Sequence, residues 1–165
     1  MASTYTPIAT TTLSGTSSGV TFSSISGSYT DLVLVVSPIS SSGGSACRIQ
    51  FNSDTGSNYS STVLYGTGSA AGSSRNSNTT YGRTHEYAGF DTTVGGTTLI
   101  LQFNNYSNTT TYKNWLSRSN QASGGVDALV GTWRSTSAIS TIYIFPSAST
   151  FASGSSFTLY GITAA

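Results

Sequence analysis

The segment Gly15-Thr16-Ser17-Ser18-Gly19 matches the G-x-S-x-G pattern of a hydrolase nucleophile elbow. In such an elbow the serine lies between a strand and a helix, and a histidine held by a carboxylate activates it. Here the residues on both sides of the segment are typical of strands, and no helix is predicted. Because a chain this rich in Ser and Gly produces the pattern by chance, we interpret the segment as a hairpin turn.

His85 is the single histidine, and it lies beside Glu86. The pattern from Tyr81 to Phe90 alternates like a strand, so these two side chains should point to opposite faces and could not act as a pair. Folding could bring two carboxylates to about 5 to 9 Å, as in a glycosidase pair, but the acids are far apart in the sequence and nothing in it indicates such a pair. We therefore expect no enzyme. The five acids are Asp31, Asp54, Glu86, Asp91 and Asp127.

The loop Asn52-Ser53-Asp54-Thr55-Gly56-Ser57-Asn58 places oxygen ligands at alternate positions around a glycine, as a calcium loop does. It lacks the closing glutamate that would bind the ion with both oxygens. Asn and Asp side chains in such loops commonly accept hydrogen bonds from their own backbone, and we favour that interpretation. No metal and no cofactor are expected.

Trp115 and Trp133, together with Tyr65, Tyr81 and Tyr112, could stack on sugar rings in a binding groove. Aromatic residues at alternating strand positions more commonly pack in a core or against another subunit. Packing is therefore the favoured interpretation, and a glycan groove remains the alternative.

Composition excludes several classes of function. Charged residues make up 7% of the chain and the net charge is +1, so no basic stripe could follow a nucleic-acid backbone. Hydrophobic residues make up 36%, which is too apolar for a disordered chain. The single cysteine cannot form an intramolecular disulfide.

The N-terminus has neither a positive region nor an apolar run, and the longest apolar run, Leu32 to Val36, is too short to span a bilayer. We expect a protein that is made in the cytoplasm, without a membrane partner. Its length of 165 residues predicts a single domain, 1–165.

Short runs rich in Val, Ile, Thr, Tyr and Phe recur between clusters of Ser, Gly and Asn, which predicts an all-β antiparallel sandwich or barrel of about 8–10 strands. Loops are expected at Ser40 to Ser45, Thr67 to Asn78 and Ser119 to Gly125. The candidate strands, some of them short or merged, are Tyr5 to Leu13, Gly19 to Ile25, Tyr29 to Ser37, Ala46 to Phe51, Ser61 to Tyr65, Thr79 to Phe90, Thr97 to Asn104, Thr111 to Trp115, Asp127 to Arg134, Ile139 to Phe145 and Ser156 to Ile162.

Two segments are candidates for contacts with a partner. The run from Leu32 to Val36 is apolar on both faces, so it is either a central strand covered on both sides or a strand whose outer face meets another subunit. Residues 1–13, with Pro7, could form an edge strand or an N-terminal arm. The contact residues that we predict are Tyr5, Ile8, Leu13, Val33 and Val35.

Four further patterns together resemble small virion proteins of tailed bacteriophages, notably those of marine and cyanobacterial phages. They are Phe22-x-x-Ile25, Tyr29-x-Asp31-Leu32, Ile49-x-Phe51-Asn52-x-Asp54 with Asn58-Tyr59-Ser60, and the terminal Leu159-Tyr160-Gly161-Ile162. The resemblance covers most of the chain, but it rests on strand and turn residues and includes no catalytic signature.

This resemblance implies a jelly-roll-like β-sandwich on the virion surface, acting as a capsid decoration (cement) protein. The implied partners are the phage major capsid protein and further copies of the chain, as a homotrimer or another homo-oligomer. The alternative is a tail-fibre or host-recognition module that binds glycan through the loops Thr67 to Asn78 or Ser119 to Gly125. We also expect Leu159 to be buried in the final strand.

Overall fold

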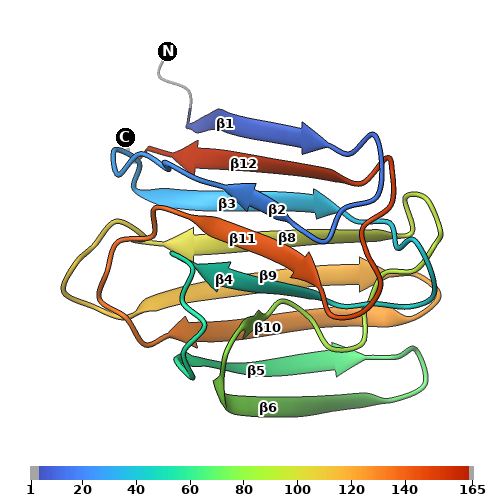
Figure 1. Ribbon diagram of the computed structural model, residues 1–165. Helices are drawn as coiled ribbons and strands as arrows, with labels where there is room; N and C mark the ends of the chain where they lie inside the picture. Colours follow the sequence, from blue (N-terminus) through green and yellow to red (C-terminus); the bar gives the residue numbers. More distant parts are fainter. Residues whose placement is uncertain (1–3, 164–165) are drawn as a thin grey trace.

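The computed structural model describes residues 4–163 and shows two antiparallel sheets, one in front of the other (Figure 1). The large sheet has eight strands in the order β1-β12-β3-β8-β9-β10-β5-β6, and the small sheet has four in the order β2-β11-β4-β7. The strands are β1 (Tyr5–Thr12), β2 (Val20–Phe22), β3 (Asp31–Ser37), β4 (Cys47–Phe51), β5 (Tyr59–Gly66), β6 (Ala71–Thr79), β7 (Gly82–Arg83), β8 (Thr97–Asn104), β9 (Lys113–Gln121), β10 (Gly125–Trp133), β11 (Ile142–Pro146) and β12 (Ser156–Ile162).

The predicted fold class, an all-β antiparallel sandwich, is confirmed. The described residues contain twelve strands, more than the sequence predicts, because short pairings such as β2 and β7 complete the small sheet. The small sheet lies over the middle strands of the large one (Figure 1). Only one face of the large sheet is therefore covered by a second sheet.

The core lies between the two sheets, because successive side chains of a strand point to opposite faces. On the central strand β3 the side chains of Leu32, Leu34 and Val36 are fully buried. In register with Leu34 on its neighbours are Leu101 and Leu159, both also fully buried. The prediction that Leu159 is buried inside the final strand is confirmed.

Phe51 is the centre of an aromatic cluster in this core. Its ring lies 5.6 Å from the ring of Phe103, 5.7 Å from Trp115 and 5.5 Å from Trp133, measured between centroids. Both tryptophans are buried, and the indole N–H of Trp115 donates to the Arg83 carbonyl. The packing interpretation of the tryptophans is thus confirmed, and neither of them can stack on a sugar.

Two glycines make room for Trp115. A Cβ at Gly131, on the neighbouring strand β10, would overlap the indole ring, and a Cβ at Gly82 on β7 would lie 2.7 Å from it. Because the cross-strand partner of Trp115 has no side chain, the largest residue of the core fits between the sheets.

Three sequence predictions of local structure are wrong. Thr67 to Asn78 is predicted as a loop but contains β6, the edge strand that pairs with β5. Thr79 to Phe90 is predicted as a strand, yet only β7 is a strand there and the rest is irregular. The predicted loop Ser119 to Gly125 is short, since β9 continues to Gln121 and β10 begins at Gly125.

The N-terminal segment forms an edge strand. β1 pairs with β12 along the end of the large sheet, from Tyr5 opposite Ile162 to Thr12 opposite Ser156, with a register irregularity between Pro7 and Ala9. Residues 1–3 of the expected arm lie outside the described part of the chain.

Candidate functional site

The serine of the elbow-like motif is held in a turn between short pairings. Ser17 Oγ donates to the Gly19 carbonyl at 2.7 Å, and the Ser17 backbone pairs with Phe151. The segment that follows is β2, so a strand stands where a nucleophile elbow has a helix. The interpretation of the segment as a turn agrees with this geometry, but the turn closes no hairpin, because β1 lies in the large sheet and β2 in the small one.

His85 lies in the irregular segment after β7, where it is buried beside Asp127 of β10. Burial lowers the pKa of its imidazole to about 4, although the charge of Asp127 opposes the shift. His85 Nδ1 lies 3.0 Å from Thr84 Oγ1, and Thr84 Oγ1 donates to the Cys47 carbonyl at 2.8 Å. The predicted strand placement of His85 is therefore wrong, and its side chain is buried within the sandwich.

Asp127 acts as a structural acceptor. Its carboxylate accepts hydrogen bonds from the backbone N–H groups of Glu86, Tyr87 and Ala88, and from Ser119 Oγ. These donors occupy the carboxylate and fasten the irregular segment onto β10. A base for catalysis needs an oxygen that is open to substrate, and in this arrangement the oxygens of Asp127 are used for folding.

The calcium-like loop uses its own oxygens. Asp54 Oδ2 accepts from Trp133 Nε1 at 2.6 Å and from Asn58 Nδ2 at 2.9 Å, and Oδ1 accepts from the Gly56 N–H at 2.8 Å. Burial raises the pKa of Asp54, but these hydrogen bonds outweigh it and the net shift is downward. The side chain of Asn52 likewise caps Ser140 and Thr141. These contacts agree with the capping interpretation.

The described residues include no group of three or more His, Cys, Asp or Glu side chains that could hold a metal ion. They also include no helix that is long and apolar enough to cross a membrane.

The large sheet leaves its outer face open, and this face is the most distinctive surface of the molecule. Two rows of side chains cross it in register from strand to strand. One row carries Val35, Ile100, Arg118, Ala128 and Leu64, and the other carries Val33, Gln102, Leu116, Val130 and Thr62. We call the apolar members of the two rows the apolar face.

The apolar face is open to solvent at its centre. Leu64 is 64% exposed, Leu116 48% and Val130 46%, and Val126 beside them is 58% exposed. The large hydrophobic side chains of monomeric proteins occur on the surface singly more often than in a contiguous group. A group on four adjacent strands, β5, β10, β9 and β8, is therefore a candidate for contact with a partner.

Polar residues border the apolar face along one side and along part of the other. Beyond one row, the neighbouring register positions hold Asn104, Asn114 and Thr132; beyond the other they hold Thr98 and Asn120, followed by the exposed Val126, which extends the apolar surface. An apolar centre inside a polar rim is the anatomy of a protein–protein interface.

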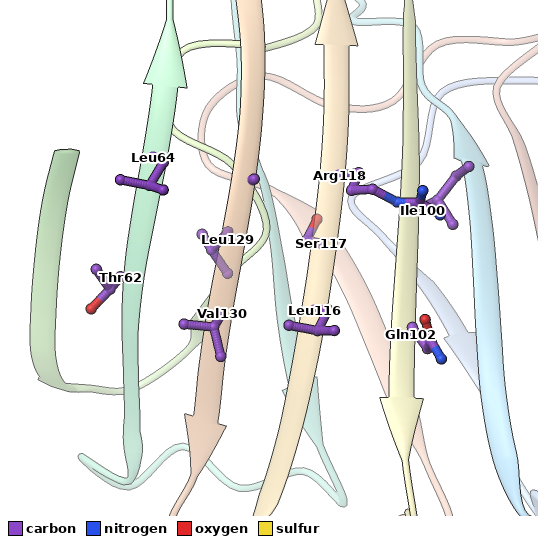
Figure 2. A pocket seen from close by; sticks show the side chains of 10 residues that line it. Thr62, Leu64, Ile100, Gln102, Leu116, Ser117, Arg118, Leu129 and Val130 are labelled. Carbon is purple, nitrogen blue, oxygen red and sulfur yellow. The ribbon is translucent and has the colours of Figure 1, made fainter. Parts of the chain in front are cut away.

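Figure 2 shows the hollow that these side chains enclose, with a volume of about 680 Å³. Leu64, Val130 and Leu116 follow one another across three strands, and the Arg118 side chain extends along the face toward Ile100 (Figure 2). The side chains that line the hollow from the outer face are aliphatic or polar, and none is aromatic.

The predicted contact residues fall into two groups. Val33, Val35 and Tyr5 belong to the outer side of the large sheet: Val33 is buried among its neighbours, Val35 is half-buried, and exposed Tyr5 lies edge-on to Tyr160 of β12. Ile8 and Leu13 pack against the core instead. The structure therefore does not gather all five at one place.

The sequence interpretation missed the centre of the apolar face, on β9 and β10. Along β9 the inward positions are Lys113, Trp115, Ser117 and Ser119, and Leu116 and Arg118 are among the outward positions. A hydrophobicity pattern would assign the faces the other way round. One signal was present in the sequence. Trp115 is the residue of this strand that most favours a core position, and if it points inward, alternation places Leu116 and Arg118 on the outer face.

A second hollow, of about 390 Å³, lies at one end of the large sheet. It is where the β5–β6 and β9–β10 turns meet, with Thr67, Asn120, Gln121 and Val126 among its lining residues. The structure thus brings together parts of the two loops that the sequence proposes for glycan binding.

No protein-family model matches the chain. No curated protein matches it either. Among solved structures, a galectin from Caenorhabditis elegans is similar with a TM-score of 0.35 and 12% identity, over 94% of this chain and 96% of the galectin.

Two further solved structures show the same degree of likeness. An exo-inulinase from Aspergillus awamori has a TM-score of 0.40 and 11% identity, over 96% of this chain and 29% of that one. A mouse laminin α1 fragment, domains LG4-5, has a TM-score of 0.32 and 15% identity, over 91% of this chain and 40% of that one. At these values the resemblance concerns general architecture and says nothing about ligands.

Proposed function

We propose that the protein is a non-enzymatic structural protein of a tailed-phage virion, which binds the assembled capsid as a decoration (cement) protein. The observation that carries the proposal is the apolar face, with exposed Leu64, Leu116 and Val130 grouped on adjacent strands. The virion setting is supported by the sequence resemblance. An adhesive β-sandwich with few charges suits a role that depends on contact and not on chemistry.

The proposed mechanism is binding energy alone. The apolar face would bury surface of the major capsid protein that is available only in the assembled shell. A ligand that binds one state and not another lowers the free energy of the state that it binds, so the shell would become more stable. A homotrimer, the assembly implied by the resemblance, would let one molecule contact several capsid subunits at once.

Of the predicted contact residues, Val35 and Tyr5 could join this surface directly. Val33 contributes mainly by supporting its neighbours, because it is only 7% exposed. Ile8 and Leu13 hold β1 and the following turn onto the core, so their substitution would disturb folding before binding. β1 ends the sheet, and this edge offers a place for a partner strand to add by β-augmentation.

Locating the chain in a reconstruction of the virion tests the proposal most directly. We expect its density on the capsid shell. In a binding assay, purified protein should bind tail-less heads that lack it, and the double substitution Leu116→Ser with Val130→Ser should weaken binding at least tenfold. Tyr112→Ser is the matched control, since Tyr112 is equally exposed but lies in the loop before β9. Density confined to the tail would refute the capsid role.

A host-recognition module that binds glycan is the second candidate. The hollow at the end of the sheet favours it, because the amides of Asn120 and Gln121 could hydrogen-bond sugar hydroxyls beside the small residues of two turns. Two results together would decide for this candidate. Purified protein would bind host cells or a glycan array, with binding lost in Gln121→Ala, and the protein would be absent from tail-less heads.

A hydrolase is the third class, and we expect no turnover of polysaccharide or ester substrates. Activity that disappears in Ser17→Ala or in Asp127→Asn, with the fold retained, would overturn this expectation.

A further inference from the structure

Arg118 is the one charged residue within the two rows of the apolar face. Its partners in register are Ile100 on β8 and Ala128 on β10, and Leu116 lies two residues before it on the same face. The Arg118 side chain is exposed and lies along the hollow (Figure 2). Two other arginines lie toward this side of the sheet: Arg75, on the edge strand β6 opposite Thr62, and Arg134, just after β10, whose guanidinium donates to Ser60 Oγ.

A partner that covers the apolar face must also cover Arg118. Removing a guanidinium from water without a new acceptor costs far more than the neighbouring aliphatic contacts contribute, so charges buried at interfaces are paired. Among the described residues, no acid lies in the two rows beside Arg118. Asp127 points inward and is fully engaged, and Asp31, at the end of β3, accepts the Asn105 N–H.

A second copy docked through the same face would not supply the acceptor. Two-fold packing of identical faces would bring the two central arginines toward each other inside an apolar contact, and like charges in such a place repel. The charge pattern therefore favours a different protein as the occupant, with a carboxylate of its own.

We infer that the apolar face recognises an acidic side chain of the partner, surrounded by apolar residues, and that Arg118 binds this carboxylate in a bidentate pair. This inference rests on the proposed function and specifies the partner surface: a patch of the capsid protein with one aspartate or glutamate at its centre. Arg118 then selects the partner and fixes the register, while Leu64, Leu116 and Val130 supply the apolar contact.

The test measures binding of purified variants to tail-less heads that lack the protein. Arg118→Met keeps the length and apolar character of the side chain but leaves the partner's carboxylate buried without a pair, so binding should weaken at least thirtyfold. Arg118→Lys should recover part of the affinity, since it restores the charge without the bidentate geometry. Arg75→Met, on the same side but at the edge, should change binding less than threefold.

Two further measurements separate the possible outcomes. Wild-type binding should weaken as salt increases, and Arg118→Met should reduce that dependence. Circular dichroism should show equal melting for all variants. Wild-type protein that fails to bind heads would refute the proposed function itself, whereas equal binding of wild type and Arg118→Met would refute only the acidic contact.

Sedimentation of the free protein tests the competing occupant. Association that becomes stronger in Arg118→Met would show that the face pairs with a second copy whose arginines repel, and this result would overturn the inference. The inference is supported if Arg118→Met and Leu116→Ser have the same oligomeric state as the wild type, because any oligomer then forms through another surface.

Discussion

The two faces of the large sheet are made by the same strands and differ in nearly every physical respect. The inner face carries Leu34, Leu101 and Leu159 in one register row and is fully buried under the small sheet. The outer face carries Ile100, Leu116 and Leu64 and has no second layer above it. Apolar residues therefore serve two different purposes on alternate positions of one strand.

This difference separates folding from binding. The inner aliphatic side chains have lost contact with water in the folded monomer, so their stabilisation is already present. The outer ones are still partly in contact with water, from half-buried Ile100 to Leu64, which is 64% exposed, and burying the rest of their surface can contribute only when a partner arrives. Substitutions on the inner face should thus change the free energy of unfolding, and substitutions on the outer face should change association.

The largest effect is expected at Leu159. Leu159→Ala leaves a cavity between β3 and β1 and should lower the free energy of unfolding by about 2 to 5 kcal/mol. Urea denaturation followed by tryptophan fluorescence measures it, because both tryptophans are in the core. A change below about 0.5 kcal/mol, the level of ordinary surface substitutions, would contradict the assignment of this strand to the inner face.

The substitution Gly131→Ala tests the packing of the inner face, because it adds one carbon atom to the core. The new Cβ in Gly131→Ala would overlap the indole ring of Trp115, which is fully buried and cannot move outward. We expect a loss of about 1 to 3 kcal/mol, the usual cost of overpacking a core. Gly66→Ala is the matched control on the neighbouring strand β5, since its Cβ would make only an ordinary contact, 3.7 Å from the Val126 side chain.

His85 should make stability depend on pH. Its pKa in the folded protein is about 4, below the unfolded value of 6.5, so only the unfolded chain gains a proton between these values. Stability must then fall as pH falls through that window. Linkage predicts a loss of roughly 1.5 kcal/mol from pH 6.5 to 5. In His85→Gln this part of the slope should vanish; an unchanged slope would mean that His85 is not buried in its neutral form.

Alternation predicted the parts of the fold in which inward positions are aliphatic. β8 is the clearest case, since Leu99, Leu101 and Phe103 share one face and all are buried. Pro38 directly follows β3 and Pro146 ends β11, as expected of a residue that cannot donate to a strand ladder. In these segments the local pattern and the tertiary burial agree.

The rest could not be predicted, because tertiary contacts decide it. β6 contains no large apolar residue and is a strand through its ladder with β5. On β9 two of the four buried positions, after Lys113 and Trp115, are the small Ser117 and Ser119, while Leu116 faces outward. The segment around His85 alternates like a strand. Three of its backbone N–H groups donate to the Asp127 carboxylate, however, so they are not available for hydrogen bonds to a neighbouring strand.

The smallest effect on stability is expected on the outer face. Leu116→Thr removes an apolar side chain that is 48% exposed and keeps a residue suited to strands, so the free energy of unfolding should change by less than about 0.5 kcal/mol. Urea denaturation at two protein concentrations measures this. A loss of 2 kcal/mol or more that grows with protein concentration would mean that Leu116 is already buried, against another copy, and that the contrast between the two faces does not exist in solution.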